Sequence, residues 1–88
     1  MTLLEALEQV EKLNSDATIW IDCSQEWSAD SFVAIAEERV EGGAPDDVPS
    51  TYEYFLEVFL VSELIHDLNL ESCEQVIEYI ISYAENDA

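Results

Sequence analysis

The side chains that could do chemistry are few. Glu63 and His66 form one Glu-x-x-His pair, a spacing that di-iron helical bundles use, but those sites need the motif twice. His66 is the only histidine, so a helix-end surface position is the simpler interpretation. Cys23 and Cys73 are the only thiols, and nothing in the sequence ties either to a general base. We therefore expect no catalytic, metal-binding or cofactor-binding site, and no enzymatic activity.

Carboxylates are the abundant reactive groups, with 21 Asp and Glu against two Lys and Arg and a formal net charge of −19. A row of four glutamates stands in the last segment at intervals of three, four and seven residues: Glu71, Glu74, Glu78 and Glu85. Helical geometry would place this row on one outward face, opposite the apolar stripe. A solvated helix face usually carries interleaved lysines and arginines, and this segment has none. The pattern predicts a partner-binding surface, with an ordinary solvated face as the alternative.

Two further features could contribute to such a surface. Asp46 and Asp47 are adjacent acids flanked by prolines in the loop sequence "EGGAPDDVPS". Trp27 stands in the turn "SQEWS" beside Glu26, and an exposed tryptophan among charges is a typical interface anchor. For Trp27 the sequence leaves open whether the ring is exposed or packed in the core, whereas Trp20 on a predicted strand is expected in the core.

The charge also restricts the class of partner. A surface this negative repels nucleic acid and anionic membranes, and it attracts basic proteins. The longest apolar run, "VFLV", is far too short to span a bilayer, and the acidic amino-terminal segment lacks the basic region of a signal peptide. We expect a cytoplasmic protein with two reduced cysteines. Acidity that serves only solubility is the alternative explanation, and a homodimer is left open.

Periodicity predicts the elements. Thr2 and Glu5 form a capping-box pattern ahead of a helix from about residue 3 to 14, and residues 17–22 are β-branched and aromatic, as in a strand. Residues 31–38 fit either a strand or a helix, and a strand is favoured because a lone strand needs partners. Residues 41–50 form a loop. Residues 52–58 are predicted as a strand that runs into a helix at 60–68, with one long helix from residue 50 as the alternative, and residues 71–84 are predicted as a helix.

The resulting order, α-β-β-β-α-α, predicts a single acidic domain over residues 1–88. Its fold class is α+β, with a small antiparallel three-stranded sheet packed against about three helices. An acidic all-α bundle is the alternative, because both ambiguous segments also fit helices.

Three motifs suggest a relationship. The segment "WSADS" after a short strand, then "YEYFLEV" and the terminal "SYAENDA", resembles a small bacterial domain family of unknown function over residues 17–88. In size and charge the chain is also similar to acidic immunity proteins and phage-encoded DNA mimics.

The function expected from these features is a non-enzymatic acidic inhibitor that binds the basic nucleic-acid-binding surface of a partner, such as a nuclease. An immunity protein that neutralises a cognate toxin is one alternative. A housekeeping or adaptor domain is another.

Overall fold

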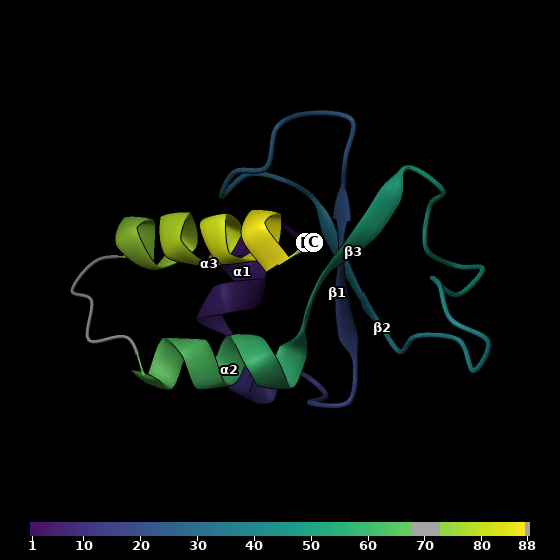
Figure 1. Cartoon of the computed structure of the whole chain (residues 1–88), viewed down its shortest axis with the longest axis horizontal. Coiled ribbons are helices and arrows are strands. Elements are labelled where there is room, and N and C mark those ends of the chain that lie inside the picture. Colours follow the sequence, from purple (N-terminus) through teal and green to yellow (C-terminus); the bar gives the residue numbers. More distant parts are fainter. Residues whose placement is uncertain (68–72, 88) are drawn as a thin grey trace.

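The chain folds as a small sheet with helices packed on one side (Figure 1). The computed structural model describes residues 1–67 and 73–87. The elements follow in the order α1 (Leu3–Glu8), a 3₁₀ turn (Val10–Lys12), β1 (Thr18–Asp22), β2 (Val33–Ala36), β3 (Tyr52–Glu57), α2 (Val58–Asp67) and α3 (Cys73–Asp87). This confirms the predicted α+β fold and its order, so neither ambiguous segment forms the helix that an all-α bundle required.

β1 is the central strand, and it pairs antiparallel with β2 on one side and with β3 on the other. Its sequence, "TIWID", is buried on both faces except at its last residue. Ile19 and Ile21 belong to the main core, which also contains residues of all three helices. Trp20 faces the other side, where it meets Tyr54 edge-to-face at 6.2 Å and its indole N–H donates to the Ala36 carbonyl at 3.0 Å. The expectation that Trp20 is buried is confirmed.

β3 departs from simple alternation. Its register with β1 shifts between Ile19 and Trp20, so Phe55 is an extra residue between the positions paired with them. Such a β-bulge turns two successive side chains to one face of the sheet. Phe55 and Leu56 are consequently both buried in the main core. Simple alternation from residue 52 predicts Tyr54 and Leu56 on one face of the strand and Phe55 on the other, and the bulge shows that this grouping is wrong.

The amino-terminal helix is shorter than predicted. Thr2 caps it as expected: its hydroxyl accepts from the Glu5 backbone N–H, and the Glu5 carboxylate accepts from the Thr2 backbone N–H. The α-helix ends at Glu8, because Gln9 leaves helical geometry with φ −117° and ψ 24°, and a 3₁₀ turn follows. The single helix predicted to residue 14 is thus two shorter pieces.

α2 and α3 run in opposite directions beside each other (Figure 1). α1 packs against α3, and the 3₁₀ turn that follows α1 packs against α2. The long connection at residues 37–51 lies on the side of the sheet away from the helices. Val48 of this connection is buried. Like Trp20, it is buried outside the main core. Within the described ranges, no helix has both the length and the apolar composition that crossing a membrane requires.

Candidate functional site

α3 positions three of the four glutamates of the predicted row. Ile77, Ile80 and Ala84 are buried against the rest of the core, which fixes the rotation of the helix about its axis. That rotation leaves Glu74, Glu78 and Glu85 exposed. Glu71 lies outside the described residues.

The row lies on a flank of α3 rather than opposite its buried side. At about 100° of turn per residue, the three glutamates fall within about 40° of one another and about 100° from the buried side. The positions directly opposite the core are Gln75, Ser82 and Asn86. The predicted placement opposite the apolar stripe is therefore wrong, and the acids stand beside the core, where another part of the chain reaches them.

That other part is the connection between β1 and β2, which holds Trp27. Its carbonyl groups at Ser31 and Ala29 accept from the first N–H groups of α1, at Leu3 (2.8 Å) and Leu4 (3.0 Å). These N–H groups have no partner inside the helix, so the contact anchors the connection to α1. The same segment closes on itself, because the Ser28 backbone N–H donates to the Ser31 hydroxyl at 2.9 Å.

Trp27 is half-buried, which answers the question that the sequence left open. Its ring packs edge-to-face on Phe55, with centroids 5.2 Å apart and an interplanar angle of 72°. Phe55 itself is turned inward by the bulge in β3. The indole is therefore anchored by the core on one side and leaves part of its surface to solvent.

Trp27 and the glutamates border two adjacent hollows. A groove of about 310 Å³, the Trp27–α3 groove, is lined by residues of the connection and of α3: Trp27, Ser28, Ala29, Glu74, Ile77, Glu78 and Ile81. A second hollow of about 410 Å³ lies between Glu85 and the residues Gln25, Glu26 and Trp27. The fold thus gathers Trp27, Glu74, Glu78 and Glu85 into one acidic surface around a tryptophan.

The ion pairs of the described residues lie elsewhere. Arg39 contacts Glu41 and lies 3.5 Å from a carboxylate oxygen of Asp46. His66 Nε2 lies 3.2 Å from Glu11 Oε1. In the portion of the chain that the structure describes, no lysine, arginine or histidine lies within 4.0 Å of the carboxylates of Glu74, Glu78 or Glu85. No basic side chain of the described residues therefore forms an ion pair with these three glutamates.

Asp46 and Asp47 do not join this surface. Both are exposed in the 37–51 connection, which Figure 1 shows away from the helices. The Arg39 guanidinium lies beside Asp46 and offsets part of its charge, although that carboxylate is fully exposed. Any contribution of these two acids would require a partner that extends around the sheet.

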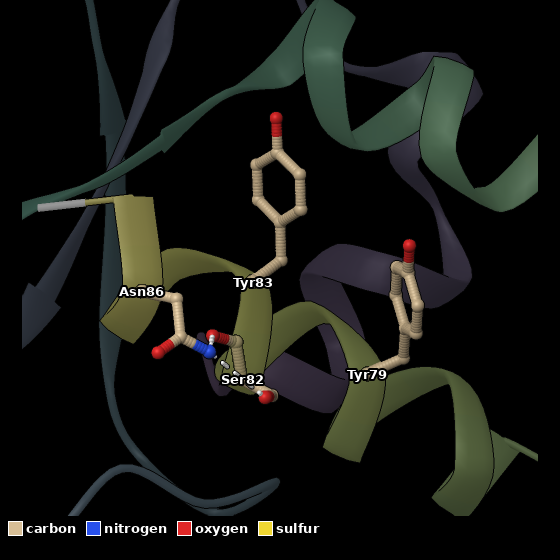
Figure 2. A pocket seen from close by; sticks show the side chains of 4 residues that line it. All are labelled: Tyr79, Ser82, Tyr83 and Asn86. Atoms are coloured by element: carbon tan, nitrogen blue, oxygen red, sulfur yellow. Dashed lines mark hydrogen bonds between the residues drawn. The ribbon is translucent and has the colours of Figure 1, made fainter.

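A third hollow lies on the side of α3 where α2 lies, and it is lined by Tyr79, Ser82, Tyr83 and Asn86. Figure 2 shows the two tyrosine rings standing off α3 in the same direction, one helical turn apart. The Asn86 side-chain amide donates to the Ser82 carbonyl at 2.9 Å, which fixes one wall of this hollow. The sequence reasoning missed Tyr79, Ser82 and Asn86, which line this hollow together with Tyr83. Their spacing at i, i+3, i+4 and i+7 was the available signal.

Cys23 and His66, the candidate reactive side chains, do not form a common site. Cys23 is half-buried, and this burial, together with the nearby Glu53 carboxylate, raises the pKa of its thiol above the ordinary value. The thiol donates to the Ile21 carbonyl at 3.5 Å and stays protonated at neutral pH. His66 contacts Glu11 instead of forming a site with Glu63. Within residues 1–67 and 73–87, no group of three or more His, Cys, Asp and Glu side chains is arranged to hold a metal ion.

Comparison of the chain with protein-family models, with curated proteins and with solved structures gave no match. The resemblance of its motifs to a bacterial domain family gains no support from these comparisons. Any functional conclusion therefore depends on the residues and their geometry.

Proposed function

We propose that this protein is a non-enzymatic acidic inhibitor that binds the basic nucleic-acid-binding surface of a partner protein in the cytoplasm. The observation that carries the proposal is the acidic flank of α3, defined by Glu74, Glu78 and Glu85. Among the residues that the structure describes, no basic side chain lies within 4.0 Å of these carboxylates, and the flank lies beside the half-buried Trp27.

The spacing of the flank suits a surface that normally holds phosphates. Glu74 and Glu78 are one helical turn apart, about 6 Å along the axis, and Glu85 is about 10 Å further on. A partner whose lysines and arginines are arranged for a phosphate backbone can bind such a row, and it releases its condensed counterions as it does with nucleic acid.

Trp27 supplies the apolar part of the same surface. Interfaces commonly combine an aromatic anchor with surrounding polar groups, and tryptophan is among the residues enriched at such anchors. The anchor is also preorganised, because Phe55 and the bonds of the β1–β2 connection hold the ring in place before any partner arrives. Less conformational entropy is then lost on binding.

The test is affinity capture from nuclease-treated host lysate at low and at high salt. The wild-type bait should retain a nucleic-acid-binding protein in stoichiometric amount, and rising salt should release it. A Glu74→Lys/Glu78→Lys bait should lose that protein. Its matched control is Glu63→Lys/Asp67→Lys, which reverses two exposed acids with the same spacing on α2 and should still retain it.

Circular dichroism of each bait establishes that the fold is intact. Capture of scattered basic proteins at low salt only, equally by all three baits, would contradict the proposal and favour acidity as general surface chemistry.

A further inference from the structure

The Trp27–α3 groove has the size and lining of a site for one side chain. Its volume of about 310 Å³ is at the lower limit of small-molecule sites, so it suits a single side chain better than a cofactor. Its lining is mostly apolar, with Ile77 and Ile81 forming the helix side and Trp27 and Ala29 the opposite side. The two carboxylates of the groove, Glu74 and Glu78, come from the same side as the isoleucines.

We propose that this groove binds an arginine side chain of the partner, an assignment that rests on the proposed function and names the group that function recognises. The apolar lining accepts the three-methylene stem of arginine, which long cationic side chains bury readily. The Glu74 and Glu78 carboxylates then meet the guanidinium, and the indole of Trp27 lies beside it.

Charge and geometry favour arginine over other occupants. An aliphatic or aromatic partner residue would leave two carboxylates beside it without a cation, and an acidic residue would be repelled. A guanidinium offers five N–H donors in a planar fork, so it can donate to both carboxylates while its plane rests on an aromatic ring. A lysine ammonium is a strongly hydrated point charge that gains less from an indole and from an apolar wall.

The groove is preformed. Trp27 is anchored on Phe55, and Ile77 is held in the core, so neither wall must be built when a ligand arrives. Neither Glu74 nor Glu78 has to break an ion pair within the described part of the chain before it can accept a guanidinium.

The probes are three short peptides, acetyl-Gly-Xaa-Gly-amide with Xaa as arginine, lysine or citrulline. Citrulline keeps the shape of arginine without its charge. Each is titrated into the ¹⁵N-labelled protein at low ionic strength, and the Trp27 indole N–H resonance, assigned with Trp27→Phe, is followed. The arginine peptide should shift this resonance saturably, with a dissociation constant about threefold or more below that of the lysine peptide. The citrulline peptide should leave the resonance unmoved.

The variants separate a built site from general attraction. Glu74→Gln/Glu78→Gln should weaken arginine-peptide binding about tenfold, because two charge-assisted hydrogen bonds are lost. Glu63→Gln/Asp67→Asn, which removes the same charge from α2, should change it less than twofold. Equal binding of the arginine and lysine peptides, an unmoved Trp27 resonance, or equal effects of the two double variants would each overturn the proposal.

The two proposals can fail separately. If the arginine peptide does not bind but a nucleic-acid-binding partner is still captured through Glu74 and Glu78, the groove assignment is wrong and the proposed function stands. If the arginine peptide binds saturably and no such partner is captured, the groove assignment stands and the proposed function is wrong.

Discussion

Glu78→Lys should stabilise the folded protein while weakening its complex. Glu74 and Glu78 are exposed on one flank of α3 and stand at i, i+4, where two like charges destabilise a helix by about 0.2–0.5 kcal/mol. A lysine at position 78 removes that repulsion and adds an attraction of similar size, in the better orientation with glutamate nearer the amino terminus. The free energy of unfolding should therefore rise by about 0.4–1 kcal/mol, and Tm by about 2–8 °C.

The assay is thermal unfolding followed by circular dichroism at low salt. Glu78→Gln is the matched control, because it removes the repulsion without adding the attraction, and it should give about half of the gain. In 1 M salt the Debye length falls to about 3 Å, so most of the difference among the three proteins should disappear.

A lower Tm for Glu78→Lys than for the wild type would refute this reasoning, since it would mean that the Glu78 carboxylate makes a stabilising contact. A gain that persists in 1 M salt would also refute it. The predicted result would show that the acidic flank opposes stability, which is expected of side chains that serve binding.

Three further predictions concern the fold. Ile80→Ala removes a fully buried side chain and should lower the free energy of unfolding by about 2–5 kcal/mol in urea titration; a loss below about 1 kcal/mol would contradict the assigned core. Trp20→Phe removes part of a buried ring and the hydrogen bond from the indole N–H to the Ala36 carbonyl, and it should lower the free energy of unfolding by about 2 kcal/mol in the same assay. An unchanged midpoint would show that this hydrogen bond contributes nothing to stability. Thr2→Ala should cost about 1 kcal/mol at pH 7, because the helix loses its hydroxyl cap. The Thr2 backbone N–H and hydroxyl lower the pKa of Glu5, and the variant loses the hydroxyl, so the cost should shrink as acid protonates Glu5, to be checked at about pH 3; a cost independent of pH would mean that the hydroxyl does not bond the Glu5 carboxylate.

Local patterns were sufficient for most of the fold. The β-branched and aromatic run at residues 17–22 forms β1, and the need of that strand for partners correctly favoured a strand around residues 33–36. The features that the sequence did not reveal are tertiary. Alternation cannot show that Phe55 and Leu56 are both turned inward, because the bulge is set by pairing with β1. The early end of α1 at Gln9 likewise has no breaker residue to signal it.

For the candidate site as well, some features can be predicted from the sequence and others depend on tertiary structure. The spacing of Glu74, Glu78 and Glu85 on one helix is readable from sequence, since it depends only on helical geometry. That Trp27 lies beside these glutamates is not readable, because it depends on how the β1–β2 connection is anchored on α1 and on Phe55. The side of α3 on which the acids lie also depends on which residues of the helix are buried in the core. The observed burial places the acids beside the core instead of opposite it.

Competition for the captured partner tests whether the acidic flank of α3 occupies a nucleic-acid-binding site. A fluorescently labelled oligonucleotide is bound to that partner, and this protein is added while anisotropy is recorded. We predict that the wild type displaces the oligonucleotide at a one-to-one ratio, and that Glu74→Lys/Glu78→Lys displaces it at least tenfold less effectively. If the wild type binds the partner while the oligonucleotide stays bound, the two ligands use different surfaces, and the claim that the acidic flank of α3 occupies a nucleic-acid site is wrong.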